Sequence, residues 1–135
     1  MINSIQMFYT IISSILMTVL LFPSFNIKAQ EEGEESDPLT LISNIKNLLD
    51  KSMTEVRAGN YTGASDLVDV AYIDNYEYIE DPLKELDADL MEETELMIRE
   101  DLAGAIEDEK PLAEITLLYN NSKANLEKAE QLFKQ

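Results

Sequence analysis

The chain has 135 residues, of which 27 are acidic and 10 are basic, so its net charge is −17 at pH 7. It contains no histidine and no cysteine, which excludes disulfide bonds, Cys or His nucleophiles, and zinc or haem sites built on those ligands. A chain this acidic repels phosphate, so we expect no nucleic-acid partner. The length suits one domain of ordinary size.

Residues 1–29 are predicted to be a signal peptide. Residues 8–22 form an uncharged apolar run, Pro23 follows it, and Ala29 ends a small-residue cleavage site. The run is shorter than the roughly 20 apolar residues that a membrane span needs. We therefore expect export and cleavage after Ala29, and an extracytoplasmic location, secreted or at the cell surface. Retention of the segment as an N-terminal anchor is the alternative.

The remainder of the chain divides into a spacer and one helical domain. Residues 30–36 are acidic and contain a glycine, which favours a disordered spacer. Residues 37–135 contain four amphipathic segments in which apolar residues recur at three- and four-residue steps, the period of an α-helix. Short polar turns separate the four segments. This pattern predicts an all-α fold, a small antiparallel bundle of about four helices.

The expected helices have recognisable ends. Asp37-Pro38 is a typical helix start, and Gly59-Asn60 is a typical stop. The second helix is expected to start near Thr62, the third to run from about Asp89 to Glu107, and Lys110-Pro111 to open the fourth.

Pro82 lies inside the second expected helix. Because proline lacks the backbone N–H, we expect the helix to kink or restart there, with Asp81 available as a new cap. The residues expected on the apolar side of this helix are Ala64, Leu67, Val68, Ala71, Asn75, Tyr78 and Ile79.

Acidic residues concentrate in the middle of the chain. Between Asp66 and Glu109 there are 17 acidic residues and two basic ones. At 100° per residue, six carboxylates of the second helix share a face about 140° wide. They are Asp66, Asp69, Asp74, Glu77, Glu80 and Asp81.

Carboxylates at this spacing can bind a hard cation, because such ions prefer oxygen ligands. The residues expected to be metal ligands are Asp74, Glu77, Glu80 and Asp81. A solvated helix face on a very acidic protein is the alternative interpretation, and the charge pattern alone identifies no metal.

Three tyrosines also lie on this helix, Tyr72, Tyr76 and Tyr78. Phenolates bind ferric iron, although tyrosines at helical spacing also occur at the edge of a core or in an interface. No serine is placed near a base, and nothing separates a catalytic acid from a base. We therefore do not expect an enzyme.

Residues 71–83 read Ala-Tyr-Ile-Asp-Asn-Tyr-Glu-Tyr-Ile-Glu-Asp-Pro-Leu, preceded by Gly59-x-Tyr61-x-x-Ala64 and continued by Leu90, Glu95, Arg99 and Ile106. The pattern over residues 59–107 resembles the extracytoplasmic helical region of the high-affinity iron permease family. That family transports iron through several membrane helices with Arg-Glu-x-x-Glu motifs. No such helices are found here, and the stretch beginning at Arg99 ends in alanine at Ala103.

The resemblance implies a stand-alone version of the soluble domain, not a transporter. We accordingly expect an exported domain with a cation-binding or iron-uptake accessory role. Its ligand would be iron or another hard cation, and its partner a membrane iron permease. The alternative is a structural or protein-interaction domain of the cell envelope, without a specific metal site, that docks onto a basic envelope component.

Overall fold

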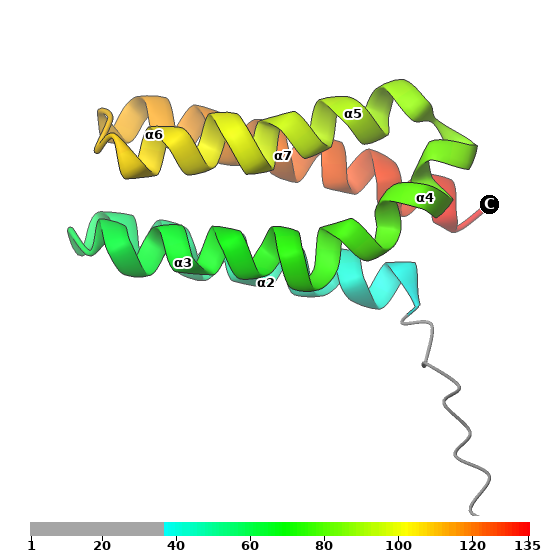
Figure 1. Ribbon diagram of the computed structural model, residues 1–135, viewed down its shortest axis with the longest axis horizontal. Helices are drawn as coiled ribbons and strands as arrows, with labels where there is room; N and C mark the ends of the chain where they lie inside the picture. The colour runs from blue at the N-terminus through cyan, green and yellow to red at the C-terminus, as the bar shows by residue number, and fades with distance from the viewer. Residues whose placement is uncertain (1–36) are drawn as a thin grey trace, which may run out of the picture. The chain divides into compact units, whose positions relative to one another are not determined.

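The computed structural model describes residues 37–135, which form four helical rods joined by short turns (Figure 1). The predicted all-α bundle is confirmed, and the described residues contain no strand. None of the helices in this range is both long and apolar enough to cross a membrane. The predicted signal peptide, the cleavage site after Ala29 and the spacer at 30–36 lie outside the described residues.

Each rod is one helix or a run of helical segments. In chain order the segments are α2 (Pro38–Arg57); α3 (Tyr61–Ala71), the π-helix η1 (Tyr72–Tyr76) and α4 (Glu77–Leu86); α5 (Ala88–Leu96), the π-helix η2 (Met97–Leu102) and α6 (Ala103–Glu107); and α7 (Leu112–Phe133). Thus the second and third rods each contain one π-helical segment, whereas the first and fourth are α-helical throughout.

The first three rods begin at residues whose side chains accept a backbone hydrogen bond. Asp37 accepts from the N–H of Thr40 at 3.2 Å, as the Asp37-Pro38 pattern predicts. Asn60 caps the second rod, and Asp87 caps the third. Such caps satisfy N–H groups that have no partner within the helix.

Of the two outcomes expected at Pro82, a kink or a restart capped by Asp81, the restart does not occur. The helix α4 continues through Pro82 to Leu86, and the break falls at Asp87, whose backbone is extended. Ile79 and Leu83 are both fully buried, and their packing keeps the chain helical across the proline. Figure 1 shows α4 bent away from the line of α3, so the kink is present without a restart.

The four rods pack antiparallel, with consecutive rods as neighbours. The helix α2 packs against α3 and α7, and the third rod packs against the second rod and α7. In Figure 1 the second and third rods form the front layer, with α2 and α7 behind them. Fully buried aliphatic side chains fill the space between the rods: Ile42, Ile45, Leu49, Ile79, Leu83, Ile98, Ile106, Ile115 and Leu126.

The π-helix η1 changes which tyrosine enters the core. The N–H of Glu77 bonds to the carbonyl of Tyr72, five residues back, so residues after η1 are rotated from their α-helical positions. Tyr76 is fully buried, and its hydroxyl donates to the carbonyl of Met91 at 2.7 Å. Tyr78 is 68% exposed, so its predicted place in the apolar stripe is wrong.

Candidate functional site

Charge is divided unequally between the two layers of the bundle. The front layer, residues 61–107, carries 15 acidic and two basic residues, a net charge of −13. The helices α2 and α7 together carry five acidic and five basic residues. We call these the acidic layer and the neutral layer. Any electrostatic function must therefore reside mainly in the acidic layer.

Two ion pairs join the helices of the neutral layer. Lys46 of α2 lies 2.5 Å from Glu130 of α7, and Lys123 of α7 lies 2.8 Å from Asp50 of α2. Hydrogen bonds from Lys134 and Lys46 lower the pKa of Glu130 to about 2. These pairs join α2 to α7, and the equal numbers of acidic and basic side chains leave the two helices without net charge.

At the centre of the acidic layer, four side chains from the second and third rods meet. The hydroxyl of Tyr72 lies 3.0 Å from Oε1 of Glu80 and 3.4 Å from Oε1 of Glu95. The guanidinium of Arg99 lies 3.5 Å from Glu95 and 5.8 Å from the centre of the Tyr72 ring. We call Tyr72, Glu80, Glu95 and Arg99 the tyrosine–glutamate cluster.

The cluster joins the two π-helices, because Tyr72 lies in η1 and Arg99 in η2. Each π-helix inserts an extra residue into its rod, and such insertions are frequent at functional sites. Tyr76, the last residue of η1, stacks on Tyr72 with ring centres 6.0 Å apart. The buried Tyr76 therefore supports one wall of the cluster.

The electrostatics of the cluster favour an added positive charge. Burial and the neighbouring carboxylates of Glu95 and Glu77 raise the pKa of Glu80. Burial, together with the bond to Glu80, raises the pKa of Tyr72 well above that of an ordinary phenol. Glu80 carries its negative charge here less easily than in water, and a bound cation would relieve that cost.

The four residues predicted to be metal ligands differ in burial. Glu80 is half-buried and belongs to the cluster, whereas Asp74, Glu77 and Asp81 are exposed. Among residues 37–135, no three or more acidic side chains converge closely enough to form a metal site by themselves. The π-helix η1 displaces only Asp74 from the other three, because Glu77, Glu80 and Asp81 all lie in α4.

Sequence reasoning did not include Glu95 among the ligands, because it lies on another rod. Its only sequence signals were the four-residue spacing to Arg99 and the place of both residues in the iron permease-like pattern. Glu95 and Arg99 form an ion pair, and the Glu95 carboxylate also accepts a hydrogen bond from Tyr72.

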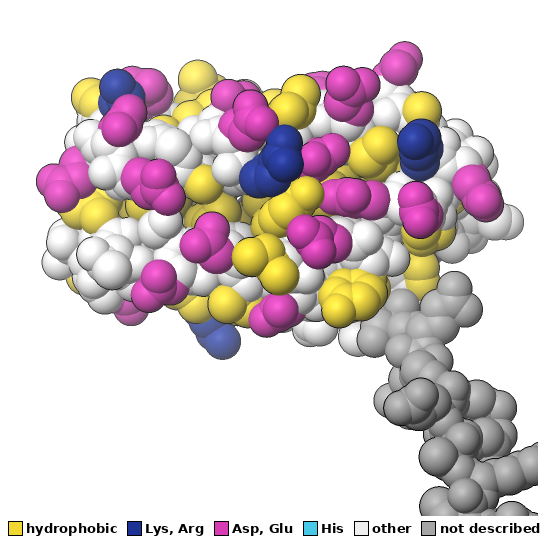
Figure 2. All heavy atoms as spheres, viewed as in Figure 1, with side chains coloured by type: hydrophobic (Ala, Val, Ile, Leu, Met, Phe, Trp, Pro, Cys, Tyr) yellow, Lys and Arg dark blue, Asp and Glu magenta, His cyan; other side chains and the backbone are white. Residues whose placement is uncertain are grey.

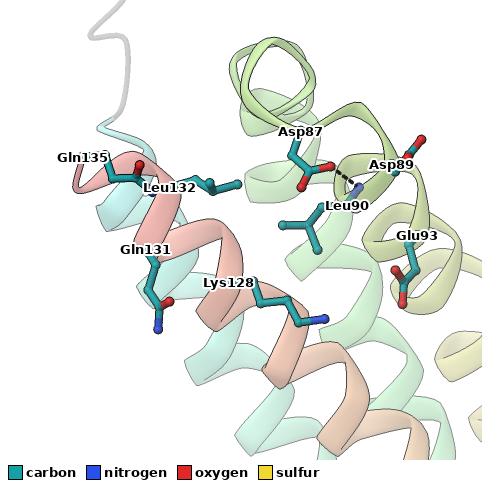
Figure 3. Close-up of a pocket in the computed structure, with 8 residues that line it drawn as sticks. All are labelled: Asp87, Asp89, Leu90, Glu93, Lys128, Gln131, Leu132 and Gln135. Atoms are coloured by element: carbon teal, nitrogen blue, oxygen red, sulfur yellow. Dashed lines mark hydrogen bonds between the residues drawn. The ribbon is translucent and has the colours of Figure 1, made fainter.

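Three surface pockets flank the third rod, and the one between η2, α6 and α7 contains both acidic side chains and Lys110. The remaining two differ in charge. One, of about 350 Å³, lies between α3 and α6 and is lined by Tyr61, Thr62, Ser65, Asp66, Asp69, Glu107 and Glu109. The other, of about 410 Å³, lies between α5 and the end of α7 (Figure 3). In the second pocket Lys128 reaches toward the third rod, where Asp87, Asp89 and Glu93 lie. Only the first pocket is lined by carboxylates without a basic side chain.

No protein-family model, curated protein or solved structure matches the chain at a significant level.

Proposed function

We propose that the chain is an extracytoplasmic accessory domain that binds a hard cation at the tyrosine–glutamate cluster. One observation carries the proposal: two carboxylates from different rods lie within hydrogen-bonding distance of one phenol hydroxyl. They do so in a layer whose net charge is −13. The domain supplies cations to a partner and performs no transport or chemical reaction itself.

The donor set suits hard cations. Glu80 and Glu95 supply carboxylate oxygens, and Tyr72 supplies a phenol oxygen that becomes a strong ligand when its proton leaves. Because the pKa of Tyr72 is raised, its deprotonation requires a cation of high charge density, which favours ferric iron over monovalent ions. Arg99 serves as the counter-ion of Glu95 when no cation is bound.

The resemblance to iron permeases supports iron as the cation. Tyr72 and Glu80 belong to the stretch 71–83 that carries the resemblance most strongly, and Glu95 and Arg99 belong to its continuation. All four lie in the cluster. In this proposal a membrane iron permease is the partner that receives the cation.

Isothermal titration of the purified protein tests the proposal, with ferric ion delivered as a weak chelate and with calcium and manganese for comparison. We expect Glu80→Gln combined with Glu95→Gln to weaken the tightest binding step at least tenfold. The matched control, Asp74→Asn combined with Glu77→Gln, removes two exposed charges from the same layer. Equal losses in both double variants would contradict a site at the cluster and support diffuse attraction by the acidic layer.

A protein-interaction domain of the envelope is the second candidate function. It is favoured by exposed apolar side chains in the acidic layer, among them Val70, Ile73 and Leu96. Cation binding alone requires no exposed apolar surface.

A further inference from the structure

Hydrophobic side chains gather in the middle of the acidic layer. Figure 2 shows them over the second and third rods, surrounded by acidic side chains. The large exposed ones in that part of the two rods are Val70, Ile73 and Leu96, with 40%, 52% and 38% of their surface exposed. Val70 and Ile73 are three residues apart across the junction of α3 and η1, and Leu96 ends α5.

The pocket between α3 and α6 lies in the same layer. Asp66 and Asp69 line it from α3, and Glu107 and Glu109 line it at the end of the third rod. Asp66 is four residues before Val70, and Asp69 is four residues before Ile73, so each acid adjoins an exposed apolar residue on the helix surface. Apolar contacts and an anionic pocket of about 350 Å³ thus lie along one stretch of α3 and η1.

We propose that this stretch of the acidic layer binds a basic amphipathic helix of a partner protein. The proposal develops the second candidate function and is independent of cation binding at the cluster. The apolar side of the partner helix would cover Val70, Ile73 and Leu96. A lysine or arginine of the partner would enter the pocket lined by Asp66, Asp69 and Glu107. Helices recognised in this way present apolar residues at helical spacing.

Charge complementarity indicates which kind of molecule binds this stretch of the acidic layer. A second copy of this chain would bring its own acidic layer, with a net charge of −13, or a neutral layer whose acidic and basic residues are equal in number. Neither compensates the carboxylates around the apolar residues, and an anionic lipid surface would be repelled. A partner that carries its own lysines and arginines satisfies both the apolar and the acidic parts of the surface.

The test uses a synthetic helical peptide with leucines at i, i+3, i+4 and i+7 and lysines elsewhere. Binding is measured by fluorescence anisotropy in EDTA, so that bound metal plays no part. A peptide of the same composition without the helical period, and spermine as a competitor, are the two controls for simple polycation attraction. We expect tight binding of the amphipathic peptide only, weakening steeply as salt is added.

Variants of the protein locate the surface. Ile73→Ser combined with Leu96→Ser should weaken binding at least tenfold, as should Asp66→Asn combined with Asp69→Asn. The matched control, Leu112→Ser combined with Leu117→Ser, removes two exposed leucines of α7 and should leave binding unchanged. Circular dichroism of each variant checks that the bundle is folded.

Three results would overturn the proposal: no binding, equal binding of the non-periodic peptide, or equal loss in the α7 variant. The cation proposal is tested separately through Glu80 and Glu95, so the failure of either proposal can be recognised by itself.

Discussion

Glu80 of α4 and Glu95 of α5 lie against the same hydroxyl group, that of Tyr72. The hydroxyl donates a single proton, so only one of the two carboxylates can receive a full hydrogen bond from it. Arg99 compensates part of their negative charge from the Glu95 side. Burial, together with the charges of Glu95 and Glu77, raises the pKa of Glu80, which makes the cluster the strongest candidate for a cation in the acidic layer.

The raised pKa of Glu80 predicts how stability depends on pH. The folded protein holds the Glu80 proton more tightly than the unfolded chain, whose ordinary carboxyl pKa is 4.5. The ionised residue therefore lowers stability once the pH exceeds the folded pKa. Glu80→Gln should raise the free energy of unfolding at pH 7 by about 0.5 kcal/mol, because the site is partly solvated. Urea titrations at pH 7 and pH 4 should show this gain shrinking in acid; a gain that is larger at pH 4 would contradict the assignment.

Glu130 predicts the opposite dependence. Its folded pKa of about 2 lies below the unfolded value of 4.5, so its contribution is present at neutral pH and is lost as the pH falls from about 5 toward 2. Glu130→Gln should therefore destabilise the protein at pH 7 by no more than about 1 kcal/mol, since the pairs with Lys46 and Lys134 are partly exposed. The same urea titrations, repeated in high salt, should show the deficit decreasing. A deficit independent of salt would show that packing, and not the ion pairs, is responsible.

The buried Tyr76 and the exposed Tyr78 test the π-helix η1. Tyr76→Phe removes the bond to the Met91 carbonyl and should cost about 1 kcal/mol. Tyr78→Phe should change stability by less than about 0.5 kcal/mol. Thermal denaturation of the two variants decides between this register and an unbroken α-helix. A larger loss for Tyr78→Phe would mean that η1 is absent in solution.

Arg99→Gln separates a cation site from a structural ion-pair network. If Arg99 is the counter-ion that a bound cation replaces, its removal should tighten ferric or manganese binding several-fold while lowering the stability of the unbound protein slightly. Calorimetric titration and thermal denaturation of the same sample provide both readings. Weaker cation binding in Arg99→Gln would indicate that the arginine positions the carboxylates instead.

The sequence was sufficient for the fold because the apolar period and the caps are local signals. Asp37, Gly59 and Pro111 mark ends of rods that the structure confirms. The inward turn of Tyr76 was not predictable in the same way, because a π-helix depends on packing against another rod and breaks the 100° period. The projection places Glu80 beside Glu77 and Asp81 on α4, but it does not show that Glu80 meets Tyr72 and the third rod.

The candidate site was predictable only in part. The sequence predicts Glu80 as a ligand and places Tyr72 on the same helix as a phenol. Glu95 was missed because joining it to them requires knowing how the second and third rods pack. Charge counts along the chain indicate the acidic middle region, but not the two ion pairs that join α2 to α7 behind it.

Paramagnetic broadening by manganese tests most directly whether the tyrosine–glutamate cluster binds a cation. Mn²⁺ prefers carboxylate and water oxygens and broadens the NMR signals of nearby amides, so substoichiometric addition locates the ion on the bundle. We expect the amides around Tyr72, Glu80 and Glu95 to broaden first. The double variant Glu80→Gln with Glu95→Gln should abolish this preference. Broadening centred on the exposed Asp74, Glu77 and Asp81, or spread evenly over residues 61–107, would contradict cation binding at the cluster.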